Sequence, residues 1–334
     1  MGKAKLSNAN FPVDDQGHTY HVGVKPGEVA NRIITVGDPA RAILIATYLD
    51  GGESIDANNH KKYLNYQSPH IFIKTSGRLF TTVTGRYKGV PVSIIAIGMG
   101  VPMVDFMVRE VRAIVHGPIH LIRFGSCGSL GKARAGDMIV ATDSMGCNRN
   151  YNYFHAGGDD LDPERFAKLM DEGNGPYSLT TTVPADEELT NQLADTVTGL
   201  DITADSFYSS QARQDPAFND ANAHLFTYLR GKYPTAECLQ METFGLYHLA
   251  QSARPLPTGE KSIRTAACAM VFAHRITNTW IDPAVVDKMQ ESCSRAILDT
   301  LINVPMDESS CTLRKAPFGP TNNLGRKSNR SWRA

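Results

Sequence analysis

Short apolar segments rich in β-branched residues alternate along this chain with segments of helical periodicity. Residues 32–36, RIITV, run directly into residues 37–49, GDPARAILIATYL, where Asp38 can cap a helix and Pro39 stands at its first position. Residues 119–124, IHLIRF, follow a helical pattern in the same way. Because strands buried on both faces form continuous apolar runs, this pattern predicts an α/β fold, a mostly buried sheet covered by helices.

The same signals recur along the rest of the chain. We expect further strands at residues 79–85, 91–98, 137–142, 200–206, 236–241 and 262–272, and further helices at residues 103–116, 185–197, 242–253 and 282–304. Residues 144–176 are polar, aromatic and glycine-rich, which predicts an irregular insertion, and we expect residues 312–334 to form a basic, flexible tail. No boundary divides the chain, so we expect one domain over residues 1–334.

The composition limits the partners of the chain. It has 334 residues with 34 basic and 34 acidic side chains, and it lacks the basic stripe that binding to duplex nucleic acid requires. No segment is apolar enough to span a membrane, and the polar start lacks the core of a signal peptide. Six cysteines without CxxC spacing argue against zinc and against a disulfide framework. We therefore expect a soluble cytoplasmic protein that binds neither nucleic acid nor membrane.

Three predicted strand ends carry glycines close to an arginine. At the first, a strand stops at Gly37 and Arg41 lies in the first turn of the next helix, which makes either an anion site or an ordinary capped helix. At the second, residues 96–102, AIGMGVP, glycines let the backbone approach a ligand closely. At the third, residues 122–130, IRFGSCGSL, Arg123 needs an anion, either phosphate or an internal carboxylate. Two arginines at such strand ends favour a small, fully charged ligand such as orthophosphate.

The third segment differs from a dinucleotide-binding fingerprint. That fingerprint has GxGxxG spacing between a strand and a helix. Here the glycines at positions 125, 128 and 131 have GxxGxxG spacing, and a strand is predicted to follow them. The sequence therefore argues against a nucleotide cofactor at this position.

Two later segments could contact an organic ligand. Gln211 and Arg213 follow Phe207, and from an extended segment the amide and the guanidinium could match a ring edge of carbonyl and N–H groups while Phe207 stacks on the ring. The alternative is a polar surface loop. Glu242 could accept hydrogen bonds from a sugar diol while Met241 packs on its apolar face, or the two could be a capping acid and a core residue.

Taken together, these segments resemble the nucleoside phosphorylase-I family, and within it the members that cleave uridine. The similarity extends from HVGV at residues 21–24 to FAHRI at residues 272–276. The motifs GDPAR, GMGVP, IRFGSCGSL, FYSSQAR and QMETF occur in the family's order, and five in sequence are highly specific. The resemblance implies a three-layer αβα fold with a central mixed β-sheet, and GMGVP is more similar to the eukaryotic, dimeric branch.

The resemblance also implies a role for each matching position. The phosphate ligands would be Gly37, Arg41, Arg123, Ser126 and Arg78, the last lent by a neighbouring subunit. The ribose ligands would be Met241, Glu242 and His21, the histidine again lent across a subunit interface. The base ligands would be Phe207, Gln211 and Arg213, with Arg275 near the uracil O4. A homodimer with shared active sites would follow.

The implied reaction is the reversible phosphorolysis of uridine to uracil and ribose 1-phosphate. Phosphate is then a co-substrate, and no cofactor is expected. Arg123, Arg213 and Arg275 are the expected catalytic residues, which would position the substrates and stabilise charge without a covalent enzyme nucleophile. A purine nucleoside phosphorylase, a phosphate-independent nucleosidase and a non-catalytic nucleoside-binding protein are the alternatives.

The chain departs from the family pattern at four positions. Cys127 replaces a second hydroxyl residue in the phosphate segment, and we expect it to be structural. Gln240 replaces a Glu before the ribose pair, so one acidic partner is missing there. Leu79 and Met103 replace the residues that bind a monovalent cation in bacterial members, so no metal is expected.

Overall fold

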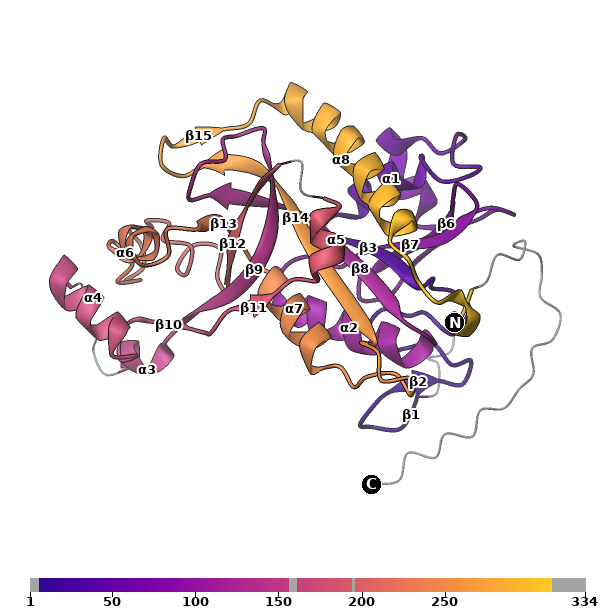
Figure 1. Ribbon diagram of the computed structural model, residues 1–334, viewed down its shortest axis with the longest axis horizontal. Helices are drawn as coiled ribbons and strands as arrows, with labels where there is room; N and C mark the ends of the chain where they lie inside the picture. Colours follow the sequence, from indigo (N-terminus) through magenta and orange to yellow (C-terminus); the bar gives the residue numbers. More distant parts are fainter. Residues whose placement is uncertain (1–5, 156–160, 194–195, 314–334) are drawn as a thin grey trace.

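A computed structural model describes residues 6–155, 161–193 and 196–313 (Figure 1). The strands of the main sheet are β3 (Arg32–Val36), β4 (Asn65–Gln67), β5 (Phe72–Thr75), β6 (Thr81–Tyr87), β7 (Val90–Ala96), β8 (Ile119–Ser129), β9 (Met138–Arg149), β10 (Tyr177–Leu179), β11 (Val183–Pro184), β12 (Val197–Ala204), β13 (Ala236–Gln240), β14 (Ile263–His274) and β15 (Thr279–Trp280). The helices are α1 (Pro39–Ala46), α2 (Val101–Ile114), α3 (Tyr151–His155), α4 (Pro163–Asp171), α5 (Glu187–Asn191), α6 (Leu225–Lys232), α7 (Thr243–Ser252) and α8 (Pro283–Asn303). Two 3₁₀ turns, η1 (Ala57–Tyr63) and η2 (Glu308–Ser310), and a small ribbon of β1 (Leu6–Ser7) and β2 (Val13–Asp14) complete the described residues.

The central sheet is mixed, as the fold class predicts. Along it the strand order is β15-β14-β9-β12-β13-β8-β3-β7-β6-β5-β4. Strand β3 lies between β7 and β8 and is parallel to both, whereas β4 to β7 form an antiparallel meander. Strand β14 pairs with β8 as well as with β9, so that β14, β9, β12, β13 and β8 close into a ring.

Helices cover the sheet on both faces. Because successive strand residues point to opposite faces, Ile33 of β3 packs with the core beneath α2 and α7, while Ile34 packs with the core beneath α1 and α8. Both isoleucines are completely buried, which stabilises the fold by about 1.5–3 kcal/mol for each side chain. Figure 1 shows the two helix pairs on either side of the sheet. The predicted three layers are confirmed.

The start of α1 follows from its first residues. The Asp38 side chain accepts a hydrogen bond from the N–H of Ala40 at 2.8 Å, and Pro39 occupies the first helical position. Proline costs nothing there, because the first N–H of a helix has no intrahelical partner. The helix therefore begins where the sequence predicts, directly at the end of β3.

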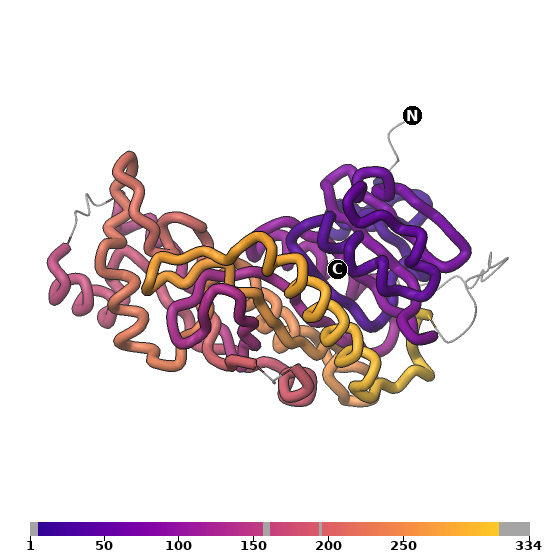
Figure 2. The backbone as a smooth tube through the Cα atoms, turned by 90° about the horizontal axis from the view of Figure 1, so that it is seen from above, coloured from indigo at the N-terminus to yellow at the C-terminus, as the bar shows by residue number. Residues whose placement is uncertain are grey.

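The predicted irregular insertion at residues 144–176 is more regular than expected. Strand β9 continues to Arg149, since it pairs with β12 and β10, and Asp162 caps α4 by accepting hydrogen bonds from two backbone N–H groups. Figure 2 shows α4 and α6 at one end of the molecule and the N-terminal strands at the other. Most of the predicted flexible tail lies outside the described residues. Thr312 does not fit that prediction, because it bonds Asn31 and His116.

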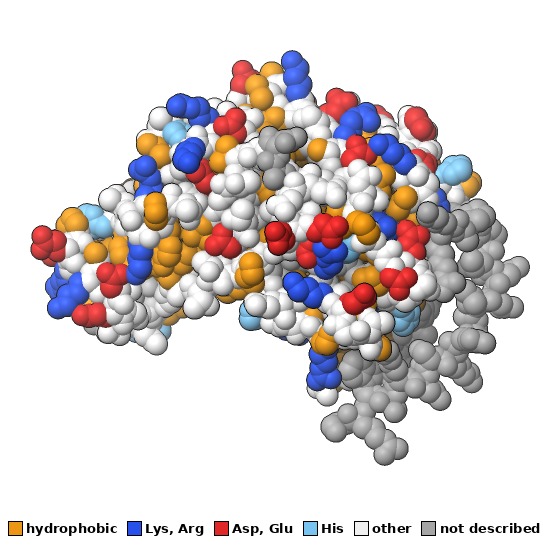
Figure 3. Space-filling model, viewed as in Figure 1, with side chains coloured by type: hydrophobic (Ala, Val, Ile, Leu, Met, Phe, Trp, Pro, Cys, Tyr) orange, Lys and Arg blue, Asp and Glu red, His pale blue; other side chains and the backbone are white. Residues whose placement is uncertain are grey.

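Two features of the molecule as a whole bear on partners. None of the helices in the described part of the chain is long and apolar enough to cross a membrane. On the face in Figure 3, Lys and Arg side chains are interspersed with Asp and Glu side chains, which fits the balanced composition.

Candidate active site

Strand β8 runs straight through the glycine-rich segment, which the sequence places after the end of a strand. Gly125 pairs with Ala269 of β14, and Gly128 pairs with Ala273. Ladder hydrogen bonds to a neighbouring strand offset the weak β propensity of glycine. A Cβ atom at Gly125 would lie 3.7 Å from Nε and Nη2 of Arg123, so the guanidinium of Arg123 extends along β8 over this glycine.

The three glycine-bearing segments lie side by side in the sheet, although the third continues as part of β8. Val36 of β3 lies opposite Ala96 of β7, and on the other side Thr35 pairs with Arg123 of β8. The N–H of Gly98 donates to the carbonyl of Gly37 at 2.9 Å. Carboxyl ends of parallel strands are the usual position of ligand sites in α/β proteins.

Arg123 is buried and only partly paired. Its Nη2 donates to Glu242 Oε2 at 2.6 Å, and its side chain is 6% exposed. Its Nε and Nη1 atoms have no hydrogen-bond partner within the described residues. The two readings of Arg123, an internal ion pair and an anion ligand, are therefore both compatible with the geometry: one nitrogen binds a carboxylate and two remain for a ligand.

Arg41 lies next to Arg123. Its Nη1 donates to the carbonyl of Phe124 at 3.3 Å, and its Nε donates to Gln290 at 3.2 Å. Burial, and after it the positive charge of Arg123, lowers the pKa of Arg41 to about 10. Ser126 stands two residues further along β8 than Phe124 and is exposed. We call Gly37, Arg41, Arg123, Ser126 and Glu242 the sheet-end cluster. Its two guanidinium groups favour an anion between them.

Glu242 is not a capping acid. It occupies the N-cap position of α7, but its side chain makes no capping hydrogen bond. Its Oε1 accepts from the backbone N–H of Gly100, the N-cap of α2, at 2.7 Å, and its Oε2 binds Arg123. Each carboxylate oxygen keeps a lone pair for a further donor, such as a sugar hydroxyl. Met241 precedes it and is half-buried.

Gln240 has an acidic neighbour on the next strand. Its Nε2 donates to Asp201 Oδ2 of β12 at 2.8 Å and to Thr203 Oγ1 at 2.7 Å. Its Oε1 accepts from the backbone N–H of Glu242 at 2.7 Å. Position 240 thus lacks the acid of the family pattern, but an aspartate lies next to it on the adjacent strand.

A second group of predicted residues gathers on the segment after β12. Arg213 stacks on the Phe207 ring, with its guanidinium carbon 3.6 Å from the ring centroid, and its Nη1 donates to Gln211 Oε1. Gln211 is buried whereas Phe207 is 43% exposed. The segment is a turn rather than the expected extended stretch, and Ala212 within it has a φ of 55°. Burial, and then the charge of Arg275, lowers the pKa of Arg213 to about 10.

Arg275 joins this turn to β8. Its Nη1 and Nη2 donate to the carbonyls of Gln211 and Ala212 at 2.9 and 3.2 Å. Its own N–H bonds Ser129, and its Cγ would lie 3.1 Å from a Cβ at Gly128. We call Phe207, Gln211, Arg213 and Arg275 the loop cluster. Ser126 is two residues from Gly128, about 7 Å along a strand, so the two clusters are neighbours.

His21 and Arg78 form a third group around Tyr20. The Nδ1 atom of His21 lies 2.7 Å from Glu110 Oε1, and its ring stacks on Phe106 at 3.9 Å between centroids. Arg78 donates to the Tyr20 hydroxyl at 2.6 Å and lies over the Tyr20 ring. The edge of the Tyr20 ring contacts His21, with 4.8 Å between centroids. We call Tyr20, His21 and Arg78 the Tyr20 cluster.

The Tyr20 cluster stands apart from the sheet-end cluster of its own chain. Glu242 binds the N–H of Gly100 at the start of α2, whereas His21 binds Glu110 near its end. Ten residues of an α-helix span about 15 Å. The structure therefore brings His21 and Arg78 together, but not to the other predicted ligands of the same chain.

Cys127 lies in a buried apolar cluster with Cys238, Ala269 and Val271. Strand alternation directs its side chain to the face opposite that of Ser126. Structural cysteines that pack in apolar surroundings are inert. This fits the structural role expected from the sequence.

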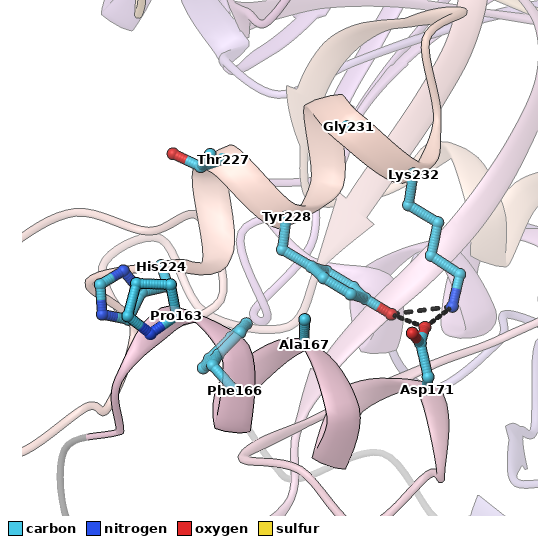
Figure 4. Close-up of a pocket in the computed structure, with 9 residues that line it drawn as sticks. All are labelled: Pro163, Phe166, Ala167, Asp171, His224, Thr227, Tyr228, Gly231 and Lys232. Carbon is cyan, nitrogen blue, oxygen red and sulfur yellow. Dashed lines mark hydrogen bonds and ion pairs between the residues drawn. The ribbon is translucent and has the colours of Figure 1, made fainter.

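A hollow of about 510 Å³ lies elsewhere, between α4 and α6 (Figure 4). Phe166 and Tyr228 form its walls, and Lys232 at its end is already paired with Asp171. Its lining includes no member of the three clusters, and its cation is neutralised, so it does not match a phosphate site. In the described ranges, no group of three or more His, Cys, Asp and Glu residues could hold a metal ion.

A family model described as the phosphorylase superfamily matches residues 31–301. The chain belongs to the phosphorylase superfamily. The matched range includes the sheet-end cluster and the loop cluster and excludes His21. The chain is a nucleoside phosphorylase, a pentosyltransferase that moves the sugar of a nucleoside to phosphate.

Individual phosphorylases match over most of the chain. A uridine phosphorylase of Thermococcus kodakarensis is 28% identical over 287 residues, 82% of this chain and 84% of that protein. The structure of a uridine phosphorylase of the oomycete Phytophthora capsici matches with a TM-score of 0.77 and 32% identity, over 90% of this chain and 100% of that one. A DeoD-type purine nucleoside phosphorylase of Caldanaerobacter subterraneus is 29% identical over 233 residues, 70% of this chain and 81% of that protein.

Sequence reasoning missed two acidic residues that support these phosphorylase clusters. Glu110 holds His21, and Asp201 holds Gln240. Each carried a signal that was available: Glu110 interrupts the apolar face of a predicted helix, and Asp201 interrupts an apolar strand. Buried acids require partners, so such interruptions indicate polar networks.

Proposed function

We propose that this phosphorylase acts on uridine, converting uridine and phosphate to uracil and ribose 1-phosphate. The observation that carries the proposal is the loop cluster, in which Gln211 and Arg213 meet beside the exposed ring of Phe207. An amide that donates and accepts, next to a guanidinium that only donates, matches the O2, N3–H and O4 edge of uracil. The matched uridine phosphorylases of Thermococcus kodakarensis and Phytophthora capsici support the same base.

Phosphate is proposed to bind in the sheet-end cluster. The two unpartnered nitrogens of Arg123, the guanidinium of Arg41 and the exposed hydroxyl of Ser126 supply donors, and Gly37 has no side chain that could obstruct a ligand. A dianion between Arg41 and Arg123 also relieves their mutual repulsion, which adds to the larger effect of burial in lowering the pKa of Arg41. Phosphate enters as a co-substrate, and we propose no other cofactor.

The reaction then depends on positioned charge. The electron pair of the C1′–N1 bond leaves with uracil, and a phosphate oxygen forms the new bond to C1′. Arg213, Arg275 and Gln211 stabilise the negative charge on the uracil, which then takes a proton from water. Glu242 holds the ribose hydroxyls and Met241 packs on the sugar. Preorganised donors of this kind supply most of a rate enhancement without a covalent enzyme intermediate.

One set of incubations tests the proposal. The protein is mixed with uridine or inosine, with and without phosphate, and free base and ribose 1-phosphate are measured. Uracil formation that requires phosphate supports the proposal. Faster cleavage of inosine identifies a purine phosphorylase, cleavage without phosphate a nucleosidase, and binding without turnover a nucleoside-binding protein.

We also propose that the active enzyme is a homodimer with shared sites. His21 binds Glu110 and Glu242 binds Gly100, two positions that lie about 15 Å apart along α2, so we propose that a second copy presents His21 and Arg78 to the site. Arg78 and Leu79 are both exposed, as residues of a subunit interface are when one chain is considered without its partner.

Complementation between two inactive variants tests the shared site. Arg123→Ala and Arg78→Ala proteins are each expected to be inactive, because each lacks one phosphate ligand. In a mixed dimer one site carries both defects and the other carries none, so co-expression restores about a quarter of wild-type activity. No recovery in verified mixed dimers would show that both arginines serve the same chain.

A further inference from the structure

Asp201 is a buried carboxylate that contacts none of the proposed substrate ligands directly. It lies on β12 with no exposed surface. Its Oδ2 accepts hydrogen bonds from Ser144 at 2.6 Å, from Thr203 at 2.7 Å and from Gln240 at 2.8 Å. Burying a carboxylate is unfavourable unless donors satisfy it; three donors from three strands converge on Oδ2, whereas Oδ1 has no hydrogen-bond partner among the described residues.

The carboxylate determines which way the Gln240 amide faces. An ionised carboxylate only accepts hydrogen bonds, so the Gln240 NH₂ group must point toward Asp201. The amide oxygen is then directed to the opposite side, where it accepts the N–H of Glu242 at 2.7 Å. With the amide turned over, two oxygens would face each other and the Glu242 N–H would lose its acceptor.

The same network fixes the turn from β13 into α7. Thr203 Oγ1, itself bonded to Asp201, accepts the backbone N–H of Phe244 at 2.8 Å. The network therefore holds the backbone at two points of this turn, the N–H of Glu242 and the N–H of Phe244. The Glu242 carboxylate at this turn contacts Arg123 and the N–H of Gly100.

We propose that Asp201 is a positioning residue, which acts through Gln240 to hold Glu242 in place for the ribose hydroxyls. This rests on the proposed function, because it assigns the sugar to Glu242. The requirement is for one acceptor and one donor facing each other across β12 and β13. Which strand carries the acid is secondary.

A charge exchange tests this requirement. Gln240→Glu places two acceptors face to face, and at pH 8 we expect kcat/KM for the nucleoside to fall by at least about 10-fold. In the double variant Asp201→Asn with Gln240→Glu, the new amide donates to the new carboxylate, which still accepts the Glu242 N–H. We expect kcat/KM to return to within about 3-fold of wild type. Asp201→Asn alone completes the cycle.

Ser144→Ala, which removes one donor to Asp201 without changing Gln240, is the matched control, and we expect it to keep near wild-type activity.

Melting temperatures of the four proteins separate positioning from folding. The proposal is supported if Gln240→Glu loses kcat/KM while its melting temperature stays well above the assay temperature, and if the double variant regains kcat/KM. If the double variant recovers only its melting temperature, or if Gln240→Glu is as active as wild type, Asp201 is merely structural and the proposal is wrong.

Assays of the wild-type protein distinguish failure of the positioning proposal from failure of the proposed function. If it cleaves inosine instead of uridine, the cycle is run with inosine, since both carry ribose. If it cleaves neither, the proposed function is wrong, and the same cycle is measured by calorimetry on ribose 1-phosphate binding. Absence of ribose 1-phosphate binding to wild type would overturn the positioning proposal as well.

Discussion

The sheet-end cluster and the loop cluster hold their arginines in different ways. Arg123 projects from the middle of a central strand, is almost completely buried, and is fixed by a carboxylate. Arg213 lies on a turn, is held by stacking on a half-exposed ring, and its neighbour Arg275 is held by backbone carbonyls. Arg123 is thus part of the sheet itself, whereas the turn that carries Arg213 can change in sequence without disturbing the sheet.

This difference matches a division of chemical tasks. Every nucleoside phosphorylase must bind phosphate and ribose, and in the function that we propose those tasks fall to residues at the end of β3, on α1, on β8 and at the start of α7. We propose that the choice of base falls to a turn, which tolerates substitution far better than a central strand. The matches to both uridine and purine nucleoside phosphorylases fit this division.

Removing the sheet-end arginine should have the largest effect. For Arg123→Ala we expect kcat/KM to fall by about 1,000-fold with any nucleoside, because phosphate loses buried donors and Glu242 loses its counterion. Steady-state kinetics with uridine and inosine measure this. Arg123→Lys keeps the charge but not the fork, so it should remain at least about 10-fold impaired. Full activity of the lysine variant would contradict bidentate binding.

Removing the loop arginine should have a smaller and base-dependent effect. For Arg213→Ala we expect kcat/KM for uridine to fall by about 100-fold, since a polar ring edge is left without a donor, while phosphate binding changes little. Arg295→Ala is the control, because Arg295 also lies over an aromatic ring, that of Tyr48, but on α8. Near-normal uridine turnover by Arg213→Ala would contradict the proposal that Arg213 binds the uracil ring.

Removing the thiol of Cys127, the residue after Ser126 of the sheet-end cluster, should have the smallest effect on activity. For Cys127→Ala we expect kcat to stay within about 3-fold of wild type, because the side chain packs in a buried apolar cluster. A catalytic nucleophile would instead lose several orders of magnitude. The measurement is kcat with uridine, together with the response of wild type to a thiol-alkylating reagent.

Local rules predicted the parts of this molecule that local contacts determine. Strand β3 and the capped start of α1 were predictable because Asp38 and Pro39 act on their immediate neighbours. The continuation of β8 to Ser129 was not, since it depends on β14, more than 130 residues later. In the same way, the ion pair of Arg123 with Glu242 joins residues 119 positions apart. Motifs indicated which residues form the site, and the long-range pairing decided how they meet.

The buried Asp201 carboxylate also ties the stability of the fold to acidity. Burial raises the pKa of Asp201 to about 6, from an ordinary value of 3.8. Between these two pH values the folded chain binds more protons than the unfolded chain, so this group makes the protein less stable as the pH rises toward 6. Above pH 6 the loss levels off at about 3 kcal/mol. Most paired carboxylates do the reverse, so the contribution of Asp201 to the free energy of unfolding is more favourable in mild acid than at neutral pH.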